Sequence, residues 1–145
     1  IRQDMPDYTP ERMEAGTLNV PGIAGLGAGL CYLKQMGIEN IFEQEQKQAK
    51  RCAAGLKKLG MKVFSGPHQA GTVSFLPGMD CETAAQILAR RGIAVRAGLH
   101  CAPLAHESAG TLESGTVRIS FGHDACDVQV RALLQAASKL LPPDS

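Results

Sequence analysis

The sequence lacks the features of membrane-spanning, secreted and strongly charged proteins. No apolar run in its 145 residues approaches the ~20 residues that a membrane helix needs. The opening stretch, IRQDMPDYTPERME, has no basic segment followed by an apolar one, so it does not resemble a signal peptide. The 15 Lys and Arg residues nearly balance the 14 Asp and Glu residues, which leaves no electrostatic signature for nucleic acid or an anionic membrane. We therefore expect a cytoplasmic protein with neither nucleic acid nor membrane as partner.

The chain also lacks the cysteine spacing of disulfide frameworks and zinc sites. Its five cysteines are an odd number and include no CxxC pair, and its histidines are too isolated to assemble a metal site. No metal is therefore expected. Four cysteines fall within or beside helical patterns and are expected to be structural: Cys31, Cys52, Cys81 and Cys126.

The pattern of apolar residues predicts one α+β domain with a small, mainly antiparallel sheet. A content of 44% hydrophobic and 20% charged residues is typical of a globular chain. A glycine-rich helix, with no charge before Lys34, is expected to be buried against close neighbours. The segment between the last two strands is expected to be an irregular loop, residues 98–115. The expected helices span 20–36, 38–59, 80–90 and 124–141, and the expected strands span 62–64, 71–76, 93–96 and 116–121.

Cys101 differs from the other cysteines because it lies in the expected irregular loop. It follows Gly98 and His100 and precedes Pro103, a setting in which a buried core position is not indicated. Functional residues concentrate on loops carried by rigid strands, and a thiol becomes nucleophilic when it is accessible and partly ionised. Cys101 is therefore the candidate nucleophile. His100 is a weaker candidate for proton transfer, because adjacent side chains on an extended loop usually diverge.

Two arginines, Arg96 and Arg118, each occupy the polar phase of a short strand whose alternate residues are apolar. If these strands share a sheet, both guanidinium groups can lie on one face near the Cys101 loop. Two such forks suit a carboxylate or a phosphate. The residues alone leave open the alternative that each is an exposed strand residue paired with a nearby glutamate.

Three segments, in matching order, resemble the class V aminotransferase family. They are RMEAGTLN at 12–19, GIAVRAGLHCAP at 92–103 and GTVRISF at 115–121. The first resembles the segment that leaves the pyridoxal-phosphate domain. The second resembles the active-site loop of cysteine desulfurases and selenocysteine lyases, and the third resembles their carboxylate-binding strand. The seventeen positions from Cys101 to Arg118 resemble the short-loop branch, and the implied fold is the C-terminal small domain of a fold-type I pyridoxal-phosphate enzyme.

This resemblance implies roles for five residues. Cys101 would take sulfur from L-cysteine, or selenium from selenocysteine, as a persulfide-type adduct, with alanine as the other product. Arg118 would bind the substrate α-carboxylate, Arg96 would position the loop and substrate, and His100 would take part in substrate binding. Thr17, just before a helix N-terminus, would bond the phosphate of pyridoxal phosphate in the neighbouring subunit of a homodimer. A sulfur-acceptor protein and a role in iron–sulfur cluster assembly are also implied.

The groups that hold pyridoxal phosphate covalently do not match any motif of this chain. Such enzymes need a Schiff-base lysine, an aspartate for the pyridinium nitrogen and a ring-stacking group. In the family these come from a large N-terminal domain. We therefore expect residues 1–37 to be the terminal segment of that domain and 38–145 to be the small domain, with the chain alone inactive. The seven lysines lie on expected helix faces or at a strand edge: Lys34, Lys47, Lys50, Lys57, Lys58, Lys62 and Lys139.

The residues leave two other functions open. A stand-alone rhodanese-like sulfurtransferase would use Cys101 with Arg96 nearby. In that family, however, the cysteine opens a cation-containing loop that runs straight into a helix, whereas this segment contains Pro103, Glu107 and Glu113. In a non-catalytic α+β binding module Cys101 would be incidental, and its thiol would react with alkylating agents no faster than the helix cysteines.

Overall fold

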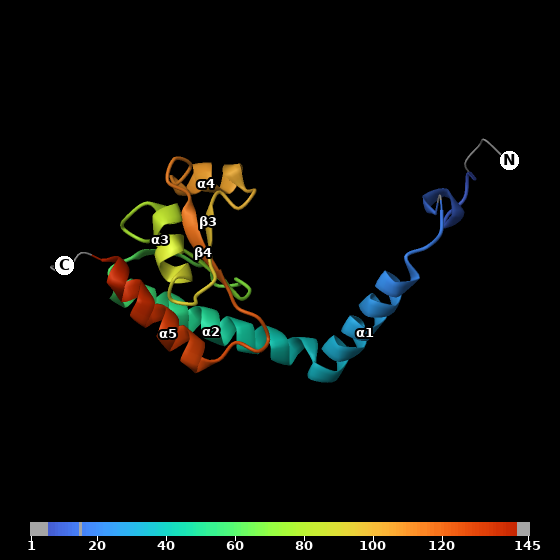
Figure 1. Cartoon of the computed structure of the whole chain (residues 1–145), viewed down its shortest axis with the longest axis horizontal. Coiled ribbons are helices and arrows are strands. Elements are labelled where there is room, and N and C mark those ends of the chain that lie inside the picture. The colour runs from blue at the N-terminus through green and yellow to red at the C-terminus, as the bar shows by residue number, and fades with distance from the viewer. Residues whose placement is uncertain (1–5, 15, 142–145) are drawn as a thin grey trace. The chain divides into compact units, whose positions relative to one another are not determined.

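The computed structural model describes residues 6–14 and 16–141, and the chain divides into two compact units, residues 1–38 and 39–145. Each unit is described by itself. The first holds a short 3-10 helix, η1 (Glu11–Met13), and the long helix α1 (Val20–Met36). The second holds a four-stranded sheet and the remaining helices (Figure 1).

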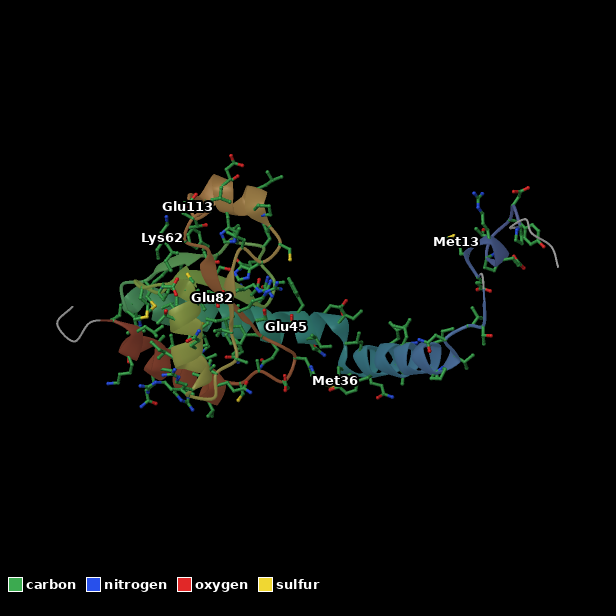
Figure 2. All side chains as sticks on the ribbon, turned by 45° about the horizontal axis from the view of Figure 1, so that its top comes forward. Met13, Met36, Glu45, Lys62, Glu82 and Glu113 are labelled. Carbon is green, nitrogen blue, oxygen red and sulfur yellow. The ribbon has the colours of Figure 1, made fainter. Side chains whose placement is uncertain are left out.

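Helix α1 forms where the sequence predicts it, but its expected burial is not found among the described residues. The side chain of Asn19 accepts a hydrogen bond from the Gly22 amide and caps the helix. No residue of α1 is buried, and Figure 2 shows its side chains standing out from the ribbon. Its large apolar side chains are at least 41% exposed: Val20, Ile23, Leu26, Leu30, Tyr32, Leu33 and Met36.

The sheet of the second unit has the strand order β1-β2-β4-β3, and every pairing is antiparallel. Its strands are β1 (Lys62–Phe64), β2 (Thr72–Leu76), β3 (Arg96–Gly98) and β4 (Thr116–Ser120). The helices are α2 (Ile38–Lys58), α3 (Cys81–Ala89), α4 (Pro103–Ala109) and α5 (Asp127–Ala137), followed by η2 (Ser138–Leu140).

The core lies between one face of this sheet and the helices α2, α3 and α5. Because side chains alternate along a strand, Val117 and Ile119 of β4 enter the core with Val73 and Phe75 of β2. Thr116, Arg118 and Ser120 therefore belong to the opposite face. The alternation thus separates the packing face of β4 from the face that carries its polar residues.

Cysteines contribute to this core to different extents. Cys52 of α2 and Cys81 of α3 are buried, and burial raises the pKa of the Cys52 thiol to about 12. Cys31 of α1 is exposed, as is Cys126, which serves as the N-cap of α5. Of the four cysteines expected to be structural, Cys52 and Cys81 therefore pack in the core of the described residues, whereas Cys31 and Cys126 do not.

Three sequence-based boundaries were wrong. The expected irregular loop contains helix α4, because Pro103 suits the first turn of a helix and Gly110 closes it in the left-handed conformation. Strand β3 begins at Arg96, the first residue that pairs with β4. Helix α5 begins at Asp127 rather than at residue 124, because Cys126 and Gln129 cap it.

Gly115 supports the approach of β3 to β4 and yields a testable prediction. It has a φ of +62°, and a Cβ placed there would lie 2.9 Å from the Cα of Gly98. We expect Gly115→Ala to lower the free energy of unfolding by roughly 1–3 kcal/mol, because the backbone conformation and the contact both become strained. Chemical denaturation measures this change. Gly66→Ala is the matched control, since its Cβ would meet nothing within 4 Å; equal effects of both substitutions would contradict the prediction.

Candidate active site around Cys101

The antiparallel register of β3 and β4 places Arg96 directly opposite Arg118. The sequence-based expectation that these strands share a sheet is therefore correct. Arg96 is exposed and Arg118 is half-buried, and the Nε atom of Arg118 is buried without a hydrogen-bond partner. Like charges directly opposite each other destabilise a strand pair. A pair of this kind favours an anion, whose charge offsets the repulsion and whose oxygens accept the free N–H groups.

Cys101 lies on a strained turn between β3 and α4. Gly98, His100 and Cys101 have positive φ values of 102°, 53° and 61°. For His100 and Cys101, which carry a Cβ, this conformation costs about 1–3 kcal/mol each and is found preferentially at functional sites. The turn leaves the Cys101 side chain exposed, and Nη2 of Arg96 donates a hydrogen bond to its Sγ across 3.8 Å. A cation in this position stabilises negative charge that develops on sulfur.

The ring of His100 is fixed by β4 rather than by its neighbour Cys101. Its Nε2 atom lies 3.2 Å from the carbonyl oxygen of Thr116 and 3.1 Å from the Thr116 hydroxyl. Because a carbonyl oxygen only accepts, Nε2 carries the hydrogen in this arrangement. The Nδ1 atom is then a free acceptor, and it is buried without a hydrogen-bond partner. Burial, followed by the positive charge of Arg118, lowers the pKa of His100 below its ordinary value, so the ring is neutral at neutral pH.

Three residues of this site had not been singled out from the sequence: Thr116, His106 and Thr111. His106 of α4 is buried, its Nδ1 lies 2.8 Å from the Thr111 hydroxyl, and its ring centroid lies 5.7 Å from that of His100. The sequence shows His106 as an isolated loop histidine because α4 was not recognised. The pairing of His100 with Thr116, sixteen residues later, has no local signal.

Thr17, the expected phosphate contact, belongs to the first unit. It is exposed and lies two residues before Asn19, the N-cap of α1. A hydroxyl beside free helix N–H groups is a suitable contact for a phosphate.

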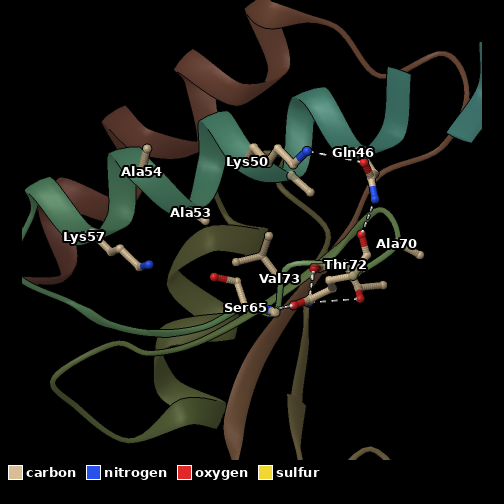
Figure 3. A pocket seen from close by; sticks show the side chains of 12 residues that line it. Gln46, Lys50, Ala53, Ala54, Lys57, Ser65, Ala70, Thr72 and Val73 are labelled. Atoms are coloured by element: carbon tan, nitrogen blue, oxygen red, sulfur yellow. Dashed lines mark hydrogen bonds between the residues drawn. The ribbon is translucent and has the colours of Figure 1, made fainter. Parts of the chain in front are cut away.

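A separate cavity of about 240 Å³ lies between α2 and the connection of β1 to β2 (Figure 3). Ala53 and Val73 form its apolar part, and Lys50, which donates to Gln46 across 3.4 Å, lies at its border. No histidine or cysteine lines this cavity, so it offers no nucleophile comparable to Cys101.

Fold and site together define a class of domain: an antiparallel sheet with helices that presents a thiol on a strained turn beside two arginines. Comparison with known proteins shows to which family this domain belongs. The aminotransferase class-V family model matches residues 3–133. The chain belongs to the aminotransferase class-V family. The resemblance noted in the sequence is thereby confirmed.

The relatives found by sequence are named as cysteine desulfurases. A probable cysteine desulfurase of Pyrococcus abyssi is 41% identical over 117 residues, which are 77% of this chain and 28% of that protein. A cysteine desulfurase of Synechococcus elongatus is 43% identical over 96 residues, 64% of this chain and 15% of that protein. The chain thus spans a third or less of the length of these relatives.

Solved structures confirm the fold class. The apo cysteine desulfurase of Thermococcus onnurineus NA1 is similar with a TM-score of 0.84 and 38% identity, over 90% of this chain and 33% of that one. The cysteine desulfurase CsdA of Escherichia coli has a TM-score of 0.82 and 31% identity over the same shares. One part of the sequence argument against a rhodanese-like enzyme was wrong, because α4 begins two residues after Cys101. The match to the class-V family model is a separate argument against such an enzyme. Within the described residues, no helix is long and apolar enough to cross a membrane.

Proposed function

We propose that the chain is the C-terminal portion of a pyridoxal-phosphate-dependent cysteine desulfurase. The enzyme removes sulfur from L-cysteine, or selenium from selenocysteine, and releases alanine, with the transferred atom held as a persulfide or its selenium analogue on Cys101. The observation that carries this proposal is the exposed Cys101 thiol, which lies on a strained turn within hydrogen-bonding distance of Arg96. The names of the relatives support the same reaction.

Each arginine has a separate task in this proposal. Arg118 binds the α-carboxylate of the substrate, since its Nε–H is buried and lacks an acceptor. Arg96 donates to Cys101, orients the sulfur and stabilises the thiolate as it attacks the sulfur of the substrate. His100 lies on the same side as Thr116 and takes part in binding the substrate.

In this proposal the cofactor is held partly by this chain and partly by residues upstream of it. Thr17 is the one phosphate contact proposed from this chain, where its exposed hydroxyl near the start of α1 suits an anion. When bound, pyridoxal phosphate withdraws electrons from the amino acid, which weakens the bond to sulfur. The Schiff-base lysine is proposed to lie upstream, because the seven lysines are on α1, α2, β1 and η2 and none is on β3, α4 or β4. In this proposal residues 1–37 end the large cofactor domain and 38–145 form the small domain.

Family resemblance supports further features of the full-length enzyme. It is proposed to be a cytoplasmic homodimer in which Thr17 serves the neighbouring subunit. Sulfur from Cys101 would pass to an acceptor protein, with iron–sulfur cluster assembly as its use.

The direct test of the proposed function uses the full-length protein with pyridoxal phosphate and L-cysteine. We expect alanine and sulfide in equal amounts when a reductant is present. Without the reductant, mass spectrometry of peptides is expected to find one extra sulfur atom on Cys101. Absence of both alanine and the added sulfur would reject the proposal.

The position of the lysines gives a second prediction. The 145-residue chain incubated with pyridoxal phosphate is expected to show no saturable one-to-one absorption band in the visible range, because no lysine lies on the elements that carry Cys101. Absorption titration, followed by borohydride reduction and peptide mass spectrometry, measures this. Stoichiometric modification of one unique lysine would contradict the proposal that the cofactor lysine lies upstream.

A further inference from the structure

Two buried polar atoms near Cys101 lack partners, and they are complementary in kind. The Nε–H group of Arg118 is a donor, and Nδ1 of His100 is an acceptor once Nε2 donates to Thr116. Leaving such atoms buried and unbonded costs free energy, so each is a position at which a ligand group that reaches it gains a hydrogen bond.

Both atoms belong to one face of the sheet. Thr116 and Arg118 are two residues apart on β4 and therefore project to the same side, about 6–7 Å apart along the strand. His100 is bonded to Thr116, and the charge of Arg118 acts on the His100 ring. A ligand that reaches both atoms needs a negatively charged acceptor and, close to it, a cationic donor. These are the two groups of an α-amino acid zwitterion.

We propose that Nδ1 of His100 accepts a hydrogen bond from the α-ammonium group of the amino acid whose carboxylate Arg118 binds. This proposal rests on the proposed function and deepens it, since it assigns the recognition of the substrate's amino group to His100. The ammonium group keeps its proton in this contact. The imidazole therefore stays neutral and keeps its Nε2–H bond to Thr116.

The charged and titratable groups around His100 fit the role of a neutral acceptor. Arg118 of β4, His106 of α4 and Arg96 of β3 all disfavour a positive charge on the ring, and burial does so most strongly. In the free site His100 is therefore neutral, and Nδ1 can accept a hydrogen bond. An incoming carboxylate on Arg118 offsets the charge of that arginine, which allows the ammonium group of the same amino acid to lie close to it.

The test compares L-alanine with propionate, which lacks the amino group, as ligands of the full-length protein. In unaltered protein labelled with ¹⁵N-histidine, we expect L-alanine but not propionate to change the ¹⁵N signal of Nδ1 of His100. His100→Gln is expected to lower the affinity for L-alanine about ten-fold, while the affinity for propionate stays within about two-fold of that of the unaltered protein. The control is His68→Gln, at an exposed histidine between β1 and β2, which should change neither affinity.

The pH dependence supplies a second measurement. Because His100 must be neutral to accept, the affinity of unaltered protein for L-alanine should fall as the pH drops through the pKa of His100, which burial and Arg118 lower below the ordinary histidine value. Propionate should show no such loss, and His100→Gln should remove the loss for L-alanine. Equal weakening of both ligands by His100→Gln, or an Nδ1 signal that L-alanine leaves unchanged, would overturn the proposal. Both are binding measurements, so they remain decisive if the protein forms no alanine from cysteine and the proposed function itself fails.

Discussion

Replacing Cys101 with serine is expected to lower sulfur release from L-cysteine by the full-length enzyme on the order of a thousand-fold or more. In the proposed reaction the attacking species is the Cys101 thiolate, and Nη2 of Arg96 lies 3.8 Å from its sulfur. A serine hydroxyl stays protonated at neutral pH and is a far weaker nucleophile. Binding of pyridoxal phosphate should be unchanged, because no cofactor contact is proposed for Cys101. Sulfide and alanine assays measure the first effect, and absorption of the bound cofactor measures the second.

Cys126→Ser is the matched control for this substitution. Cys126 is also exposed, and it is the N-cap of α5, a position that serine suits well. Activity close to that of the parent is expected. Turnover by Cys101→Ser within a few-fold of the parent would remove Cys101 from the mechanism.

Arg118→Ala is expected to raise the KM for L-cysteine about ten- to a hundred-fold, because a charge-assisted hydrogen bond to a carboxylate contributes about 1.5–3 kcal/mol. The half-buried guanidinium has an unpartnered Nε–H and a fork geometry that takes both carboxylate oxygens. Arg118→Lys keeps only a point charge and should also impair binding. A smaller loss of kcat is expected from misplacement of the substrate.

Cysteamine, which lacks the carboxylate, separates recognition from structure. Arg118→Ala should raise the KM for L-cysteine much more than the KM for cysteamine. Arg131→Ala, at an exposed position on α5, should change neither KM. If Arg118→Ala weakens both compounds equally, the arginine does not recognise a carboxylate and its role is structural.

The fold was predictable where a local pattern fixes it. Alternation of Val117 and Ile119 with polar neighbours predicts β4, and Asp80 predicts the start of α3, where its side chain accepts from the Thr83 amide. Helix α4 was missed, although Pro103 and Gly110 are suitable signals for its two ends, because seven residues provide too short an apolar period.

The site was predictable only in its parts. Cys101 was a candidate because of its place in the expected loop, and Arg96 and Arg118 were candidates because of strand phase; the family resemblance implied all three. The register of β3 with β4 places the two arginines opposite each other. The fixed ring of His100 was not predictable, because it depends on a carbonyl group sixteen residues away on another strand. Pairings of this kind arise from tertiary structure and leave no mark on local composition.

The burial of Cys52 makes it a built-in reporter of core opening. Its thiol, with a pKa of about 12 and no exposed surface, can react with an alkylating agent only in molecules whose α2 has transiently left the sheet. The ratio of its labelling rate to that of a free thiol therefore gives the equilibrium constant of this opening. Exposed Cys101 reacts without any such opening. One labelling time course, resolved by residue, therefore measures both the reactivity of the Cys101 thiol and the frequency with which the core opens at Cys52.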